Sequence, residues 1–314
     1  MTRTHGAGSA RWGLGLDVGG TKTIGGVVNL STGNILVHRQ TATGAERGGE
    51  PVLRNTVALA EELQAASEER GAAIEVAGIA VAELVDPAGV VRSAHTIAWR
   101  GIGIREAFDH IAPAFVESDV RAAALAEARF GAGRPYRIFA YISVGTGISS
   151  CLVQDGVPFV GSRGNALVLA SAPNTSICEE CGSRQDLVLE DVAAGPGLAA
   201  RYSARVDRHV GSGQEVMAAL ASGDPDARHV VSTAGEALGN SVGWLVNVLD
   251  PDAVVVGGGL GLAGGLYWDR FITSARQHIW SEATRDLPIV TAELGANSAC
   301  IGASLAASRL VAAS

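Results

Sequence analysis

The stretch LGLDVGGTKTIGGVV, residues 14–28, decides the fold class because it joins two short apolar runs through a Gly-Gly turn. Apolar runs of this length, bounded by glycines, are typical of buried strands connected by a tight turn. The stretch also contains Lys22, the only lysine among the 314 residues. We interpret Lys22 as a point charge that faces an anion at this turn, with chance survival in a lysine-poor chain as the alternative.

A second stretch repeats this pattern. RIFAYISVGTGISSCLV, residues 137–153, again places two apolar runs around a glycine-containing turn. Between the two stretches, three- and four-residue apolar spacing predicts a surface helix over residues 51–70, with Gly71 just past its end, and strands and helices alternate after it. This alternation predicts an α/β fold. Two similar strand-turn-strand stretches favour two related lobes that face each other across a cleft. Two unrelated hairpins are the alternative.

Composition and charge exclude several classes of protein. With 47% hydrophobic residues, the chain can bury one large core or two moderate ones. A net charge of -8 without any Lys/Arg cluster excludes a nucleic-acid partner. Because the sequence lacks both a run of about 18 uncharged apolar residues and a hydrophobic leader, we expect no membrane partner, no secretory signal and a cytoplasmic location.

Four segments, in this order, resemble the ROK group of sugar kinases (repressors, open reading frames and kinases). LDVGGTKT resembles the first phosphate loop of this family, ESDVRAAALAEARFGAG its catalytic segment, SVGTGISSCL its second phosphate loop and NVLDPDAVVVGGGLG its adenosine segment. The resemblance implies a two-lobed, actin-like ATPase (ribonuclease H-like) fold. It also implies a small lobe of residues 1–120 and 299–314, a large lobe of residues 121–298, and a homodimer.

The nucleotide side of the expected site is rich in glycine. Glycine turns let backbone amides approach phosphate oxygens, and a carboxylate suits Mg²⁺ held through water. Either turn alone could be an ordinary hairpin, and Asp17 could be an Asx-turn residue. The resemblance implies ATP and Mg²⁺ as cofactors, bound by Asp17, Gly19, Gly20, Thr21, Lys22, Gly145, Thr146, Gly147, Gly257, Gly258 and Gly259.

Asp119 is the candidate catalytic residue. Phosphoryl transfer to an alcohol requires a group that orients the hydroxyl and accepts its proton, and a carboxylate does both. Asp119 also stands where a helix N-cap belongs, just before VRAAALAEARF, so capping is the alternative. The resemblance favours the role of base.

The acceptor side departs from the family. Val168 and Ser171 stand where typical members carry the Glu and His of a Gly-Glu-x-Gly-His segment. Because a site discriminates by pairing its polar groups with the ligand, we expect an amino sugar, a deoxy sugar or a sugar-like cyclitol rather than glucose. The candidate substrate contacts are Glu83, Thr96, Ser118 and Glu190.

Two of the substitutions on this side introduce charge. Glu83 replaces a family glycine, and Arg121 replaces the second asparagine of the Asn-Asp-x-Asn segment. We expect the Glu83 carboxylate to bind an amine of the substrate. The alternative is a surface ion pair between Glu83 and Arg121.

The zinc motif of the family is incomplete. Cys178 and Cys181 remain, and Asp186 stands near the position of the third cysteine. Closed structural zinc sites need four ligands, so the sequence leaves Zn²⁺ uncertain. A pair of reduced thiols in a loop is the alternative.

We therefore expect an ATP-dependent kinase that phosphorylates a primary hydroxyl of a sugar-like substrate. A non-catalytic sugar-binding pseudokinase or sensor of the same fold is the second interpretation. A ROK-type repressor is disfavoured, because the first strand begins by residue 14 and leaves no room for a helix-turn-helix.

Overall fold

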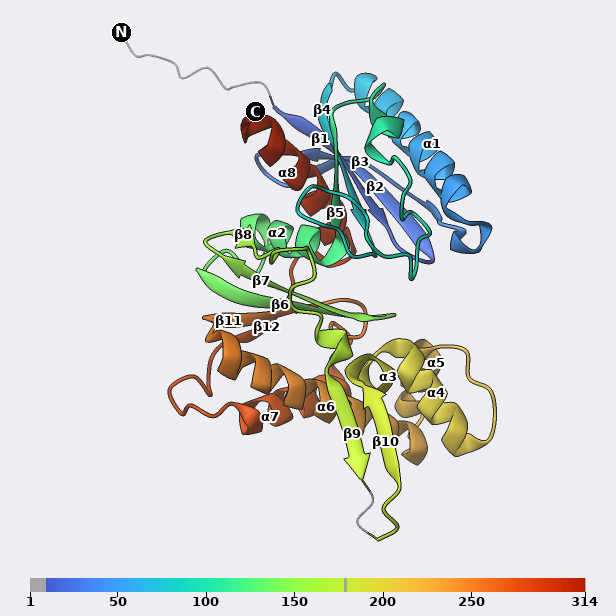
Figure 1. The fold of residues 1–314 in the computed structure, drawn as a ribbon, viewed down its shortest axis with the longest axis vertical. Coiled ribbons are helices and arrows are strands. Elements are labelled where there is room, and N and C mark those ends of the chain that lie inside the picture. Colours follow the sequence, from blue (N-terminus) through green and yellow to red (C-terminus); the bar gives the residue numbers. More distant parts are fainter. Residues whose placement is uncertain (1–9, 178–179, 314) are drawn as a thin grey trace. The chain divides into compact units, whose positions relative to one another are not determined.

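The computed structural model describes residues 10–177 and 180–313. The chain forms two compact units (Figure 1). Unit 1 comprises residues 1–131, 158–166 and 297–314. Unit 2 comprises residues 132–157 and 167–296.

Unit 1 is built on a five-stranded sheet with the order β3-β2-β1-β4-β5. Its strands are β1 (Trp12–Val18), β2 (Lys22–Asn29), β3 (Ile35–Ala42), β4 (Ile74–Val81) and β5 (Ala114–Ser118). The first three strands are antiparallel neighbours joined by short turns, whereas β4 and β5 run parallel to β1. The hairpin expected around the Gly-Gly turn is therefore confirmed.

Helices cover the two faces of this sheet (Figure 1). α1 (Gly49–Glu68) packs against β1, β2 and β3, while α8 (Ser298–Ala313) packs against β1, β4 and β5 and also contacts α2 (Asp119–Phe130). A Cβ on Gly15 or Gly78 would come within 2.0 or 1.9 Å of a backbone oxygen of α8. These glycines therefore let α8 lie directly on the sheet backbone. Two short 3₁₀ helices complete the unit, η1 (Ala45–Arg47) and η2 (Arg105–Phe108).

Unit 2 repeats the topology of unit 1. Its sheet has the order β12-β11-β6-β7-β8, so a hairpin again stands beside two strands that run parallel to its first strand. The strands are β6 (Ile138–Val144), β7 (Ile148–Gln154), β8 (Val157–Pro158), β11 (Ala253–Gly257) and β12 (Ile289–Thr291). The prediction of two related lobes is confirmed at the level of strand order.

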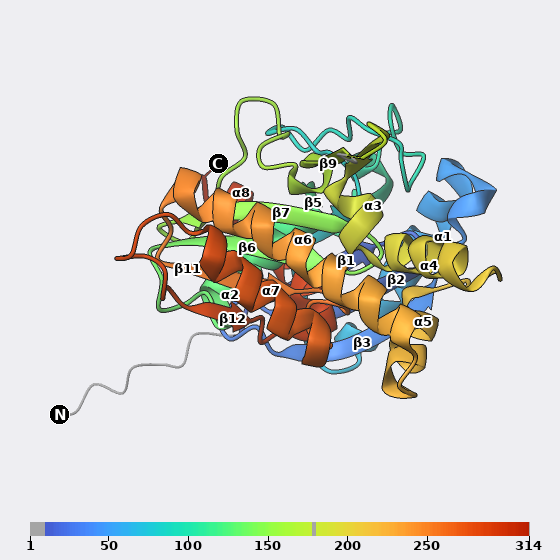
Figure 2. The same ribbon diagram turned by 90° about the horizontal axis from the view of Figure 1, so that it is seen from below.

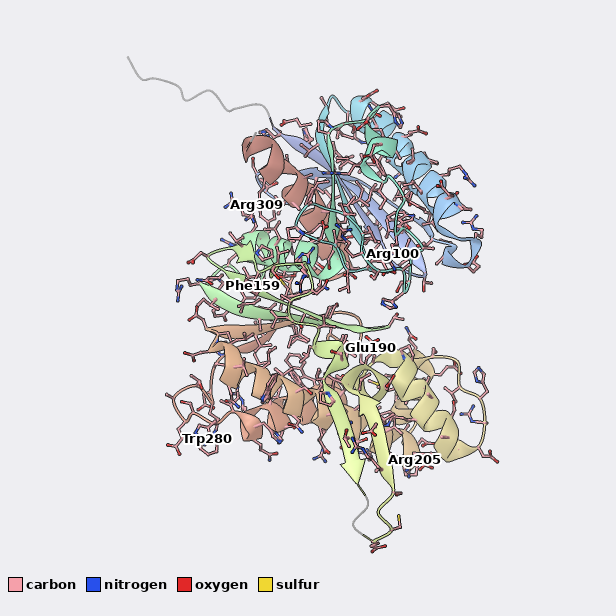
Figure 3. All side chains as sticks on the ribbon, in the orientation of Figure 1. Arg100, Phe159, Glu190, Arg205, Trp280 and Arg309 are labelled. Atoms are coloured by element: carbon pink, nitrogen blue, oxygen red, sulfur yellow. The ribbon has the colours of Figure 1, made fainter. Side chains whose placement is uncertain are left out.

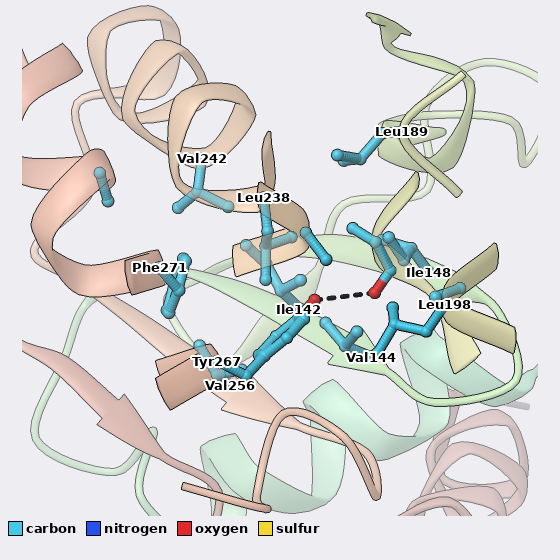
Figure 4. Packing of buried hydrophobic residues seen from close by; sticks show 14 of the residues in the cluster. Ile142, Val144, Ile148, Leu189, Leu198, Leu238, Val242, Val256, Tyr267 and Phe271 are labelled. Atoms are coloured by element: carbon cyan, nitrogen blue, oxygen red, sulfur yellow. Dashed lines mark hydrogen bonds between the residues drawn. The ribbon is translucent and has the colours of Figure 1, made fainter. Parts of the chain in front are cut away.

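The core of unit 2 lies between this sheet and a layer of helices. α6 (Pro225–Leu249) and α7 (Gly265–His278) lie side by side along the sheet (Figure 2). Tyr267 of α7 is buried, and its hydroxyl donates to Ala193 O at 2.8 Å (Figure 4). This bond pairs the one polar atom of the Tyr267 side chain within an apolar cluster. The remaining elements of the unit are η3 (Leu169–Ser171), β9 (Pro173–Ile177), β10 (Arg184–Val188), α3 (Leu189–Ala193), α4 (Gly195–Val206), α5 (Gly213–Ala221) and, at the return to unit 1, η4 (Gly295–Asn297).

The units differ from the expected lobes in one helix. The sequence assigned residues 121–298 to the large lobe, but α2 belongs to unit 1, where it packs on α8. Residues 158–166 also belong to unit 1. Within the described part of the chain, every helix is too short or too polar to cross a bilayer.

Candidate active site

Strand register brings the two candidate carboxylates of unit 1 together. β1, β4 and β5 are parallel, and Val18, Val81 and Ser118 form one row across their carboxyl ends. Asp17 precedes this row by one residue, and Asp119 follows it by one. The carboxyl edge of parallel strands is where open α/β sheets bind their ligands.

The pKa values of both carboxylates are raised, and the charge of Asp119 contributes to the shift of Asp17. The pKa of Asp17 is raised from 3.8 to about 7, first by burial and then by the charge of Asp119, while the Lys22 ammonium lowers it. Burial also raises the pKa of Asp119 to about 6. Perturbed carboxylates at a strand edge are typical of functional sites. Lys22 therefore lies close enough to Asp17 to act on its charge.

Asp119 does not cap its helix. Ser118 is the N-cap of α2, and Asp119 is the first helical residue. The Asp119 carboxylate accepts the N–H of Val120 at 2.7 Å and a hydrogen bond from the Ser118 hydroxyl. The capping alternative is therefore wrong, and the role of Asp119 as base stays a prediction.

The first expected phosphate loop is the turn between β1 and β2. The N–H of Gly19 donates to Lys22 O at 3.1 Å and closes this turn. Gly20, Thr21 and Lys22 are exposed. These three residues lie at the exposed end of the hairpin, whereas the Gly19 amide serves the turn.

The second phosphate loop and the adenosine segment meet within unit 2. The N–H groups of Leu260 and Gly261 donate to Val144 O at 3.0 and 3.1 Å. A Cβ on Gly145 would lie 3.8 Å from Gly259 N. The Gly145–Gly147 turn, which contains Thr146, therefore lies directly beside the Gly257–Gly259 segment.

The three glycines of the adenosine segment have different reasons to be glycine. A Cβ on Gly257 would lie 2.5 Å from the Tyr141 hydroxyl. Gly258 has φ +82°, and a Cβ there would lie 2.4 Å from Val144 O. Gly259 has an ordinary φ, and nothing lies within 4 Å of its Cβ position. The fold requires the first two glycines, but it leaves open space at the third.

Glu83 serves a loop of its own chain. This side chain is 7% exposed, and its carboxylate accepts a hydrogen bond from the Ser93 hydroxyl. It also accepts the N–H groups of His95, Thr96 and Ile97 at 3.0, 2.5 and 2.7 Å. These hydrogen bonds lower its pKa against the opposing effect of burial. Both carboxylate oxygens are therefore occupied, which removes the observation that favoured an amine-bearing substrate.

The alternative role for Glu83, a surface ion pair with Arg121, is wrong. Arg121 is 6% exposed and pairs instead with Glu117 at 2.5 Å. The sequence did not reveal this burial. The signal available was the i,i+4 spacing of Glu117 and Arg121 at the start of a helix.

The other substrate candidates lie in different parts of the fold. Thr96 is exposed, and its methyl group lies 2.7 Å from the Cβ position of Gly20, so it stands beside the first phosphate loop. The Ser118 hydroxyl donates a hydrogen bond to the Asp119 carboxylate. Glu190 of α3 (Figure 3) accepts the N–H of Ile148 at 2.7 Å, at the end of the second phosphate loop. Their roles as substrate contacts stay predictions.

The expected zinc ligands are only partly visible. Cys178 lies outside the described residues. Cys181 is exposed and donates to the Ser183 hydroxyl at 3.2 Å, while Asp186 pairs with Arg184 at 2.7 Å. In residues 10–177 and 180–313, no three His, Cys, Asp or Glu side chains gather as a metal site. Among the described residues, Cys181 and Asp186 therefore do not form a zinc site.

Asp17→Asn should stabilise the protein at alkaline pH. Because the pKa of Asp17 is higher in the fold than in the unfolded chain, the native state loses stability as pH rises from about 4 through about 7. Removing the charge should therefore raise the free energy of unfolding at pH 8 by about 2–4 kcal/mol. Urea titrations at pH 8 and pH 4 would measure the effect, which should be much smaller at pH 4. A gain equal at both pH values, or a gain also seen for the exposed Asp109→Asn, would contradict it.

Comparison with known proteins identifies the family. The profile of the ROK family matches residues 13–309. A bifunctional enzyme NanE/NanK of Brucella melitensis is 32% identical over 92% of the chain, and the chain spans about half (52%) of that relative.

Solved structures extend the likeness to the whole chain. A ROK hexokinase from Thermus thermophilus is 30% identical with a TM-score of 0.79, covering 96% of this chain and 100% of that one. A ROK glucokinase from Streptomyces griseus, solved with glucose and AMPPNP, is 26% identical with a TM-score of 0.79, covering 95% and 99%. The fold is thus the two-lobed actin-like ATPase fold that the motifs implied, and the chain belongs to the ROK family.

Proposed function

We propose that this protein is an ATP-dependent kinase that phosphorylates a primary hydroxyl of a sugar or sugar-like molecule. The observation that carries the proposal is the Asp17–Asp119 pair, two partly exposed carboxylates with raised pKa at the carboxyl edge of one sheet. Neither the capping of α2 nor an ion pair explains Asp119. The Streptomyces griseus relative, whose structure contains glucose and AMPPNP, supports the same chemistry.

Asp119 would act as the general base. Its carboxylate accepts the proton of the acceptor hydroxyl while that oxygen forms a bond to the γ-phosphorus of ATP. The bond from the γ-phosphorus to the β,γ-bridging oxygen breaks, and ADP leaves. A pKa of about 6 keeps most of the carboxylate ionised at neutral pH and leaves it basic enough to take the proton.

Asp17 fits a divalent cation. Carboxylate oxygen is the ligand type that Mg²⁺ prefers, and a cation beside Asp17 would offset the burial and the negative charge of Asp119 that raise the pKa of Asp17. Bound there, Mg²⁺ would neutralise charge on the phosphates of ATP. Lys22, the nearby ammonium, would supply a second positive charge.

The acceptor is best sought among sugars with fewer hydroxyls than glucose. Val168 is 46% exposed, and the Ser171 hydroxyl donates to the backbone of Val168 at 2.8 Å. An apolar side chain and an occupied hydroxyl therefore replace the Glu and His of typical members. With Glu83 also occupied, a deoxy sugar or a cyclitol is favoured over an amino sugar.

A coupled assay of ADP release tests the proposal. The panel would contain glucose, 2-deoxyglucose, glucosamine and a cyclitol with a hydroxymethyl group. We expect ADP release with at least one panel member and a higher kcat/KM for the deoxy sugar or the cyclitol than for glucose. A clear preference for glucose would overturn the acceptor class. Binding without ADP release would identify the protein as a sugar sensor. The altered acceptor side is the observation that favours this second interpretation.

Adjacent glycines offer a test of the nucleotide side. Gly259→Ala adds a methyl group to open space, so we expect unchanged thermal stability and an ATP KM raised at least about fivefold by crowding of the nucleotide. Gly258→Ala is the matched contrast, since its φ and its contact with Val144 O should destabilise the fold. An unchanged ATP KM in Gly259→Ala would place the nucleotide elsewhere.

We further propose a homodimer. Three large apolar side chains of unit 2 are exposed, namely Trp244 at 60% and Val248 at 57% on α6, and Trp280 at 88% (Figure 3). Trp280 N donates to Asn247 of α6, which brings the three into one region. Light scattering on a size-exclusion column should give twice the 32.0 kDa chain mass. A Trp244→Glu variant should be monomeric.

A further inference from the structure

Residues 158–166, here called the strap, join unit 1 although the chain on both sides of them belongs to unit 2. The first residue of the strap, Pro158, is the last residue of β8, and residues 159–166 contain no helix or strand. Residues 159–166 therefore lack the backbone ladder that fixes a strand within a sheet. Specific contacts must hold it against unit 1.

Arg121 supplies such contacts. Its guanidinium donates to Gly164 O of the strap at 3.0 Å and to Val85 O, in the loop after β4, at 2.6 Å. Its Nε donates to the Glu117 carboxylate of β5 at 2.7 Å. One side chain of α2 thus joins three segments that are distant in sequence.

The burial of this group makes its hydrogen bonds important. The side chains of Arg121 and Glu117 are 6% and 14% exposed. Removal of the guanidinium would leave a nearly buried carboxylate and two carbonyl groups without these donors, which costs far more than the loss of a surface ion pair. The planar fork of arginine reaches all three acceptors, and the single ammonium of lysine does not.

Gly164 shows how closely the strap approaches the loop after β4. Its φ is +81°, and a Cβ would lie only 2.0 Å from Val85 O. Backbone therefore contacts backbone at this point. The Arg121 guanidinium donates hydrogen bonds to the carbonyl oxygens of Gly164 and Val85. It therefore holds the two segments against each other.

The same loop continues to the acceptor side of the site. Glu83, two residues before Val85, holds the backbone of residues 95–97 through its carboxylate. Thr96 within that segment lies against Gly20 of the first phosphate loop. Arg121 is also only two residues from Asp119 on the same helix.

We propose that Arg121 is a positioning residue that holds the strap and the loop of residues 83–85 against the helix that carries Asp119. The acceptor-side segments of unit 1 are thereby fixed relative to the base before substrate binds. The expected change in kinetics rests on the proposed kinase function, whereas the expected release of the strap does not.

Limited trypsin digestion tests the contact directly. Arg163 is exposed within the strap and precedes Gly164, so cleavage after Arg163 reports release of the strap. In Arg121→Gln we expect this cleavage, followed by mass spectrometry, to be at least about tenfold faster than in the wild type, in a protein that keeps its circular dichroism spectrum. Arg205→Gln, which removes an exposed ion pair of unit 2, is the control and should leave the rate unchanged.

Kinetic measurements separate positioning from general damage. With a substrate from the panel above, Arg121→Gln should raise the acceptor KM at least about fivefold and leave the ATP KM within about twofold. Arg121→Lys, which keeps charge and stem, should lie between the wild type and Arg121→Gln in both assays. If the wild-type protein shows no kinase activity but strap cleavage is still faster in Arg121→Gln, the proposed function is overturned and the Arg121 contact is supported.

Three results would overturn the proposal. The first is an unchanged rate of cleavage after Arg163 in folded Arg121→Gln. The second is an equal rise in both KM values. The third is global unfolding of both Arg121→Gln and Arg121→Lys, which would make Arg121 a general core residue rather than the support of one segment.

Discussion

Asp119→Asn should lower kcat by roughly 10²- to 10⁴-fold, the usual effect of removing a general base. The amide keeps the size of the side chain and still accepts the N–H of Val120, so the start of α2 should be unchanged. It cannot take the proton of the acceptor hydroxyl. The ATP KM should stay close to that of the wild type, because the phosphate loops are untouched. Initial rates of ADP release at saturating acceptor would measure the loss.

A matched variant makes this result interpretable. Asp109→Asn introduces the same chemical change at an exposed position of unit 1 and should keep full activity. Thermal melting of both variants would show that the fold is intact. If Asp119→Asn retained turnover within tenfold of the wild type, another group would have to be the base.

Gly302→Ala should destabilise the protein by several kcal/mol, although alanine is the better helix former. In an exposed helix, the change from glycine to alanine gains about 1 kcal/mol. Here the added Cβ would lie 1.7 Å from Ala122 O and 2.3 Å from its carbonyl carbon, both rigid backbone atoms of α2. The overlap forces α8 and α2 apart, and the packing loss outweighs the propensity gain. Urea unfolding would measure the change in free energy.

The control for this variant is Gly259→Ala, which adds the same methyl group where no atom lies within 4 Å. That protein should unfold at the wild-type urea concentration. A more stable Gly302→Ala protein would show that α2 and α8 are farther apart than the structure places them. Because α2 carries Asp119, lowered stability should be accompanied by lowered turnover.

The sequence correctly predicted the first hairpin of each sheet. It did not predict the contacts of the charged residues on the acceptor side. Apolar runs and glycine turns are local signals, so β1, β2, β6 and β7 could be placed from them. The resemblance to the family selected Asp17 and Asp119 as site residues, and no local pattern placed them together. The structure adds the physical reason, which is the parallel register of β1, β4 and β5.

Buried charges explain what the sequence could not show. Glu83 was expected to bind an amine of the substrate, with a surface ion pair to Arg121 as the alternative, because charged side chains are rarely buried. Each is buried because backbone groups from distant segments satisfy it, N–H groups for Glu83 and carbonyl groups for Arg121. Those partners are 12 to 43 residues away in the chain, so no local pattern could reveal them. The membership of residues 158–166 in unit 1 was missed for the same reason.

The shared strand order of the two units has a consequence for their history. Tandem copies of one ancestral unit would leave the same arrangement twice, and β1 and β6 then correspond residue by residue, with Val18 matching Val144 at the glycine turn. In this correspondence Asp17 matches Ser143. One copy therefore carries the acid, and the other carries a neutral hydroxyl.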